Sequence, residues 1–160
     1  QVKAFTVTNI GDFSETQIAA LTATQVQALT STQIATLDAT QLGNMTTTQV
    51  AAMTSSQIRS LTAGNVGALA ETQIAAMTTT QVASLSATAM GTFNATQVGA
   101  FSTAQVAALT RAQVSVLTNA TLSAFDATQI AAMNATQIKS LTTTQITALD
   151  ATNIAEFTTT

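Results

Sequence analysis

Hydrophobic residues recur at two fixed places in every eight residues of this chain. The pattern runs through 19 complete octads, from Phe5 to Glu156, as in 141–148, Leu-Thr-Thr-Thr-Gln-Ile-Thr-Ala. Position 1 of the octad is always Leu, Met or Phe, and position 6 is always Ile, Val, Leu or Met. A short fixed period of this kind is typical of a quasi-one-dimensional stack of similar units.

The polar positions predict that each octad begins a helix. Position 2 is Ser, Thr, Asp or Asn in 19 of 20 occurrences, and these residues favour helix N-caps. Position 5 is Gln in 14 of 19 octads, and a Gln three residues after the cap completes a reciprocal capping box. Positions 1 and 6 are then the two places that meet in a hydrophobic staple.

Each predicted helix must also end before the next cap, so it spans only about five or six residues. Position 7 is mostly small, which suits a chain that leaves the helix there. Helices this short are unstable alone in water, so we expect positions 1 and 6 to be buried along a shared core. Five of the six glycines fall at position 7: Gly11, Gly43, Gly67, Gly91 and Gly99.

We therefore predict an all-α solenoid with one very short capped helix in each octad. At position 8, one set of alanines recurs every 24 residues, which is three octads, and this points to three octads per coil. Two octads per coil is the alternative. The position-8 residues that share this spacing and are all alanine are Ala28, Ala52, Ala76, Ala100, Ala124 and Ala148.

A β-solenoid is the alternative fold, because Thr, Val and Ile favour strands. Strand faces alternate with period two, so positions 1 and 6 would point to opposite faces of one straight strand. The octad would then need a corner within it, and the cap-type residues and Gln would need separate explanations. These requirements favour the helical prediction.

Four octads depart from the pattern. Gly64 lies inside a predicted helix, and Ala70 cannot cap one. Ala89 and Thr121 replace the position-5 Gln. No linker or change of composition divides the chain, so we predict a single solenoid domain, 1–160. Its first four residues fit positions 5 to 8 and its last four fit positions 1 to 4, and we expect a piece cut mid-repeat from a longer array.

Composition argues against several classes of function. Charged residues make up only 7%, and four Lys and Arg give no basic patch for nucleic acid or anionic lipid. No window is apolar enough for a membrane-spanning helix. The chain has no His and no Cys, which removes the commonest bases, nucleophiles and soft metal ligands.

The carboxylates add little candidate chemistry. Asp38, Asp126 and Asp150 occupy the cap position, and Asp12 with Glu15 is the only close acidic pair. Calcium needs more oxygen ligands than one such pair. We expect no enzyme activity, no catalytic residue, no cofactor and no metal site. The Phe and Met residues sit in the hydrophobic columns and are expected to be core.

Two polar columns remain as candidates. The position-5 Gln residues are expected to cap helices and to form interior hydrogen bonds. The position-4 Thr residues are expected to form external rows, which are the alternative binding surface for ice or for a cell-surface ligand.

The octads, for instance Met77-Thr-Thr-Thr-Gln-Val-Ala-Ser84 and Phe125-Asp-Ala-Thr-Gln-Ile-Ala-Ala132, resemble the Leu-Thr-Thr-x-Gln-Ile/Val-x-Ala repeats of very long bacterial surface and secreted proteins. The resemblance covers essentially the whole chain. It implies an extracellular or cell-surface repeat region that serves as a stalk or spacer, and it carries over no binding residue. The expected partners are neighbouring repeats of the same chain, and end-to-end self-association is one conceivable further contact.

Overall fold

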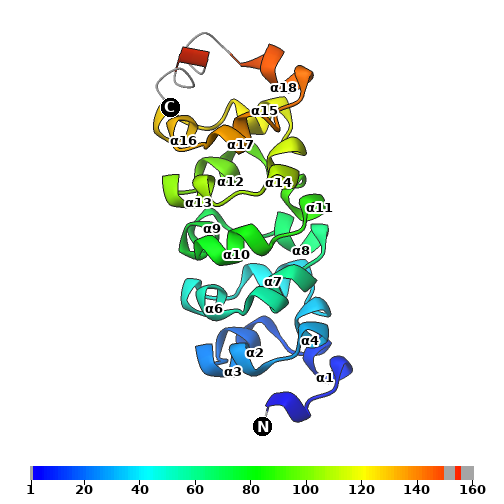
Figure 1. Ribbon diagram of the computed structural model, residues 1–160. Coiled ribbons are helices and arrows are strands. Elements are labelled where there is room, and N and C mark those ends of the chain that lie inside the picture. Colours follow the sequence, from blue (N-terminus) through cyan, green and yellow to red (C-terminus); the bar gives the residue numbers. More distant parts are fainter. Residues whose placement is uncertain (1, 150–153, 156–160) are drawn as a thin grey trace.

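The computed structural model describes residues 2–149 and 154–155, and within them the chain forms one short helix in each octad (Figure 1). The described residues contain no strand, so the all-α prediction is confirmed and the β-solenoid is wrong. The elements are η1 (Val2–Ala4), α1 (Val7–Gly11), α2 (Glu15–Ala19), α3 (Ala23–Ala28), α4 (Ser31–Ala35), α5 (Ala39–Gly43), α6 (Thr47–Ala52), α7 (Ser55–Ser60), α8 (Ala63–Gly67), α9 (Glu71–Ala76), α10 (Thr79–Ser84), α11 (Ala87–Met90), α12 (Ala95–Gly99), α13 (Thr103–Ala107), α14 (Arg111–Ser115), α15 (Asn119–Leu122), α16 (Ala127–Ala131), α17 (Ala135–Ile138) and α18 (Thr143–Ala148).

The predicted capping box begins the helices. At α10, the Gln81 backbone N–H donates to Thr78 Oγ1 at 3.2 Å, and the Thr78 N–H donates to Gln81 Oε1 at 2.7 Å. Every described α-helix except α9 has a side-chain cap at position 2, and in α11 and α15 this cap lacks the reciprocal bond from position 5. At α9, Ala70 has no side-chain oxygen, so only one half of the box forms, in which the Ala70 N–H donates to Gln73 Oε1 at 2.8 Å.

Many helices end at position 7, as predicted, but not through a left-handed glycine. No described residue has a positive φ, and the residue after Gly43, Asn44, keeps a right-handed φ of −86°. The small residues have another use there. A Cβ on Gly43 would lie 3.4 Å from the Ala68 carbonyl oxygen, so the next coil comes within van der Waals contact of this position-7 residue.

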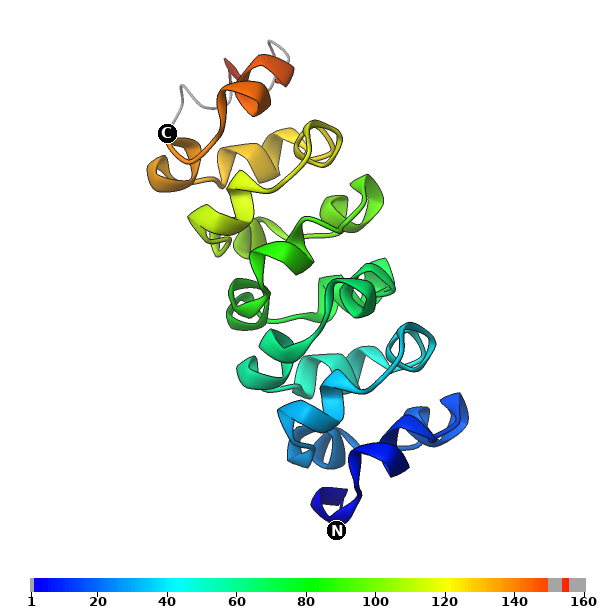
Figure 2. The same ribbon diagram turned by 90° about the vertical axis from the view of Figure 1, so that its right-hand side faces the viewer.

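Each helix packs against the third helix before it and the third after it, as α4 and α10 pack on α7. Three octads therefore make one coil, and the two-octad alternative is wrong. The coils stack into a rod with α1 at one end and α18 at the other (Figures 1 and 2). Its three columns of helices are column 1 (α1, α4, α7, α10, α13, α16), column 2 (α2, α5, α8, α11, α14, α17) and column 3 (η1, α3, α6, α9, α12, α15, α18).

The columns wind around the axis of the rod. In Figure 1, column 1 starts on the right with α1 and α4, crosses the front at α7 and α10, and reaches the left at α13 and α16. A row of identical side chains on one column therefore follows a spiral and does not lie on one flat face.

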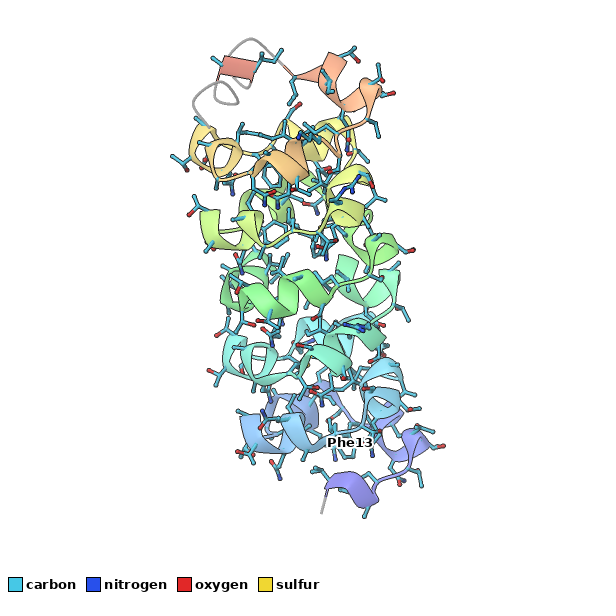
Figure 3. All side chains as sticks on the ribbon, viewed as in Figure 1. Phe13 is labelled. Carbon is cyan, nitrogen blue, oxygen red and sulfur yellow. The ribbon has the colours of Figure 1, made fainter. Side chains whose placement is uncertain are left out.

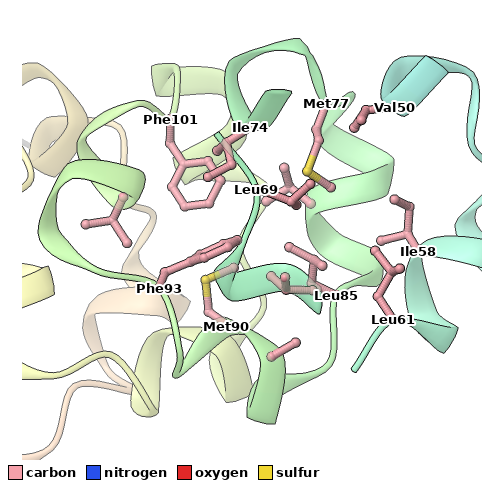
Figure 4. Packing of buried hydrophobic residues seen from close by; sticks show 14 of the residues in the cluster. Val50, Ile58, Leu61, Leu69, Ile74, Met77, Leu85, Met90, Phe93 and Phe101 are labelled. Carbon is pink, nitrogen blue, oxygen red and sulfur yellow. The ribbon is translucent and has the colours of Figure 1, made fainter. Parts of the chain in front are cut away.

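Positions 1 and 6 build one continuous core along the rod. Every position-6 side chain from Ile10 to Ile130 is at most 1% exposed. The close-up in Figure 4 shows Phe93 and Phe101 on neighbouring octads, with ring centroids 5.7 Å apart at 61°. Because each coil contributes only a few such side chains, it depends on its neighbours for burial.

Candidate functional site

The position-5 amides form a buried column of hydrogen bonds that joins each coil to the one before it. The side chain of Gln81 is only 3% exposed, and its Oε1 accepts from the cap of its own helix. Its Nε2 donates to the Met53 carbonyl at 2.7 Å and to the Val50 carbonyl at 2.9 Å. One side chain therefore accepts a hydrogen bond at the start of its own helix and donates hydrogen bonds to carbonyls at the end of a helix in the preceding coil.

This pair of hydrogen bonds between coils recurs along the rod with the same sequence separations. The Nε2 or Nδ2 group donates to the carbonyl 28 residues earlier, and usually to a second one 30 or 31 residues earlier. The residues that do so are Gln33, Gln41, Gln49, Gln57, Asn65, Gln73, Gln81, Gln97, Gln105, Gln113, Gln129, Gln137 and Gln145.

The hydrogen bonds from position 5 to the preceding coil explain why this position never carries glutamate. A capping box works with either Glu or Gln, because it needs only a side-chain oxygen. The bond to the preceding coil needs a donor as well, and an ionised carboxylate has none. The absence of Glu at position 5 was thus the signal in the sequence for a contact between coils.

Between Gln33 and Gln145, two octads lack this link. Ala89 has no polar group, and Thr121 Oγ1 donates within its own helix to the Thr118 carbonyl at 3.0 Å. In the first case a different bond joins the coils, because Thr92 Oγ1 at position 8 donates to the Ala63 carbonyl at 3.2 Å. Ser60 makes the same position-8 bond to Ser31, at 2.9 Å.

The predicted external rows of Thr are exposed but interrupted. Every described position-4 Thr is exposed to solvent along the rod, where Figure 3 shows the side chains as sticks. One complete coil, α13 to α15, has Ala104, Ala112 and Ala120 instead, so all three rows break at the same level. The remaining Thr follow the spiral of their columns. This arrangement provides neither an unbroken nor a flat array.

Four of the charged side chains line two shallow hollows on column 2. One hollow brings together Glu15 and Asp38 from adjacent coils, and Asp12, three residues before Glu15, does not line it. The other brings together Arg111 and Lys139. No three His, Cys, Asp or Glu side chains gather closely enough to hold a metal ion in the part of the chain that the structure describes.

One carboxylate has a perturbed pKa. Thr128 Oγ1 donates to Asp126 Oδ1 at 2.6 Å, and the Gln129 N–H donates to the same oxygen at 2.8 Å. These bonds, the Thr128 bond first, lower the pKa of Asp126 below its ordinary value. The second of these bonds, from the Gln129 N–H, is the helix cap that the sequence predicts for this residue.

Comparison with known families, curated proteins and solved structures finds no match for this chain. Among the described helices, none has the length and apolar character needed to cross a bilayer. The functional argument therefore depends on the geometry of the repeat itself.

Proposed function

We propose that this chain is a structural repeat module, a stalk or spacer, in a bacterial cell-surface or secreted protein. The observation that carries the proposal is the uniform link between coils. The same amide-to-carbonyl bonds, 28 residues apart, recur from Gln33 to Gln145 in every octad except those of Ala89 and Thr121. Each added coil reproduces the contacts of the last one, so the length of the rod is set by the number of octads.

The exterior supports the same proposal. Its exposed positions carry mostly Thr, Ser and Ala, and the charged groups are few and scattered. In the described residues, the apolar side chains and the position-5 amides are buried in the interior, where they hold the coils together. The resemblance of the octads to repeats of long bacterial surface and secreted proteins supports the location.

The alternative, a binding surface on the Thr rows, has less support. A surface that matches ice or a repetitive ligand needs regular spacing over an extended plane. The gap at Ala104, Ala112 and Ala120 interrupts the rows, and the winding of the columns removes the plane. We therefore expect neither ice shaping nor adhesion from these residues.

The proposal is tested by changing the number of coils in a surface-displayed chain. Residues 37–60 (three octads that keep both the cap and the Gln) are duplicated once or twice between a membrane anchor and a fluorescent tag. The height of the tag above the membrane should rise by the same increment for each added coil. A height that does not follow the number of coils would contradict the spacer function.

A second variant separates the spacer from a binding surface. Thr72→Ala, Thr80→Ala and Thr88→Ala remove exposed hydroxyls from one further coil without touching the buried columns. The displayed height and the adhesion of the cells should both stay unchanged. If adhesion or ice shaping is present and is lost in this variant, the exposed Thr rows are the functional surface.

A further inference from the structure

Four exposed asparagines of this chain begin the tripeptide Asn-x-Thr, the acceptor sequence for sugars linked to the Asn side chain. They are Asn44, Asn94, Asn119 and Asn134. Because Thr is abundant in the octads, the tripeptide alone carries no argument. On the folded rod a transferase also needs an accessible Asn nitrogen and an accessible Thr hydroxyl, neither of which is held by another group.

Asn94 meets both conditions in the middle of the rod. Its Oδ1 accepts the Gln97 N–H at 2.9 Å, which caps α12, and its backbone is extended, with φ −88° and ψ 174°. The side chains of Asn94 and Thr96 are both exposed. Within the described residues, neither the Asn94 Nδ2 group nor the Thr96 hydroxyl makes a hydrogen bond, so the two groups that a transferase reads are both available.

Asn134 repeats this arrangement three coordinates of the octad pattern at a time: cap, small residue and Thr. Its Oδ1 accepts the Thr136 N–H at 3.0 Å and the Gln137 N–H at 3.1 Å, and its Nδ2 and the Thr136 hydroxyl have no partner among the described residues. The side chains at positions 2 and 4 are exposed at every place where the structure describes them. This accessibility therefore belongs to the repeat and does not depend on where the rod begins or ends.

The other two asparagines fail these conditions. Thr121, which completes the tripeptide of Asn119, is 4% exposed, and its hydroxyl donates to a carbonyl at the start of its own helix. At Asn44, the Nδ2 group donates to the Thr40 carbonyl at 2.9 Å, and the Thr46 hydroxyl is engaged as the cap of α6. The fold thus divides four identical motifs into two available sites and two blocked ones.

We propose that Asn94 and Asn134 are sites of N-glycosylation on the outside of the rod. In the reaction, Nδ2 forms a bond to the anomeric carbon of a hexose carried by a nucleoside diphosphate. The bond from that carbon to the diphosphate breaks, the diphosphate leaves with the electron pair, and the transferase takes one proton from Nδ2. The glycosylated amide keeps Oδ1, so the caps of α12 and α17 survive.

The inference rests on the surface or secreted location under "Proposed function". An exterior made mostly of Thr, Ser and Ala has few charged groups to keep it in water. A sugar is bulky and solubilising, and it adds polar surface there without changing the buried columns.

The test is transfer to the folded 160-residue chain by a purified N-glycosyltransferase that recognises Asn-x-Ser/Thr, with UDP-glucose as the donor. Mass spectrometry of proteolytic peptides should find one hexose at Asn94 and one at Asn134, and none at Asn44 or Asn119. Synthetic peptides that contain the four tripeptides are the unfolded reference, and all four should be modified.

Three outcomes would overturn the proposal. In the first, Asn94 and Asn134 stay unmodified in the folded chain although their peptides are modified. In the second, all four asparagines of the folded chain are modified equally. In the third, the peptides show the same selection as the folded chain, because the fold would then not be its cause.

Single substitutions assign each modification to its site. Asn94→Asp keeps the oxygen that caps α12, as Asp126 does in α16, and removes the nitrogen. Thr96→Ala removes the hydroxyl instead. Each variant should lose the hexose at position 94 and keep the one at Asn134. The matched control is Thr88→Ala, at an exposed position-4 Thr outside any acceptor tripeptide, which should keep both. A hexose that persists at Asn94 in Thr96→Ala would contradict the proposed recognition.

This test and the spacer test can fail separately. Transfer to the purified chain measures which side chains are accessible and does not depend on location or length. The double variant Asn94→Asp, Asn134→Asp has no available acceptor, and its displayed height should still rise by the same increment for each added coil. Unchanged circular dichroism of the variants checks that the fold is intact.

Discussion

Gln81 in the middle of the rod and Gln17 at its end occupy the same octad position and make the same capping box. Gln81 is buried and also donates to Met53 and Val50 of the preceding coil. Gln17 is exposed and caps its helix only. The comparison separates two roles of one side chain: its oxygen starts a helix locally, and its amide nitrogen holds the stack together.

The largest effect on stability should come from a substitution that removes the amide donor of a position-5 Gln and keeps its acceptor oxygen. Gln81→Glu keeps the cap but buries a carboxylate against two carbonyl groups. An uncompensated buried charge costs about 3–5 kcal/mol, so the free energy of unfolding should fall by about that amount. Gln17→Glu should change it by less than about 0.5 kcal/mol. Equal losses in urea denaturation of the two variants would show that the nitrogen has no separate role.

The next effect concerns the core in the middle of the rod and at its α18 end. Ile74→Ala removes a fully buried position-6 side chain and should cost about 2–5 kcal/mol. Ile146→Ala removes the corresponding side chain where it is 49% exposed, so its cost should be well below that of the interior variant. Thermal denaturation of the two variants in dilute solution checks the difference. Similar losses would mean that burial between coils does not stabilise position 6.

Caps should matter less than the links between coils. Thr78→Ala removes a side-chain cap from α10 and should cost about 1 kcal/mol. Ala70→Thr should stabilise α9 by a similar amount, because the backbone of Ala70 already has the extended geometry of an N-cap, with φ −69° and ψ 154°. Denaturant midpoints of both variants test this, and a destabilising Ala70→Thr would contradict it.

The smallest effect is the pH dependence of one cap. The lowered pKa of Asp126 means that its contribution to stability is present above the unfolded-state pKa and is lost as the pH falls through the folded-state pKa, below about pH 4. Thr128→Ala removes the first cause and should raise the pKa of Asp126 toward its ordinary value. Carboxyl chemical shifts in an NMR titration measure it. Thr136→Ala, beside the uncharged cap Asn134, is the control and should leave that pKa unchanged.

Local chemistry made most of the fold predictable from the sequence. The cap at Thr78 and the Gln three residues later specify where a helix begins, and both lie within one octad. The sequence indicated the number of octads per coil less clearly, through the residues at position 8. In the structure, Ser60 on column 1 and Thr92 on column 2 use position 8 to reach carbonyls of the preceding coil, whereas position 8 of column 3 is alanine from Ala28 to Ala148.

The contacts between coils were harder to predict because they join residues about 30 positions apart. Gln was expected to cap helices and form interior bonds, but which carbonyls it reaches follows from the coil geometry. The winding of the columns depends on small rotations that no single residue specifies. The external Thr rows were predicted as rows, and the spiral that makes them curve is visible only in the assembled rod.

The most direct test of the central claim is the hydrogen exchange of side-chain amide groups, measured by NMR. If Gln nitrogens link the coils, the Nε2 protons of Gln81, Gln105 and Gln113 should exchange slowly, while those of Gln17 and Gln25 exchange at the rate of free glutamine in dilute, monomeric chain. Fast exchange at all five residues would contradict the account, because the interior amides would then be open to water.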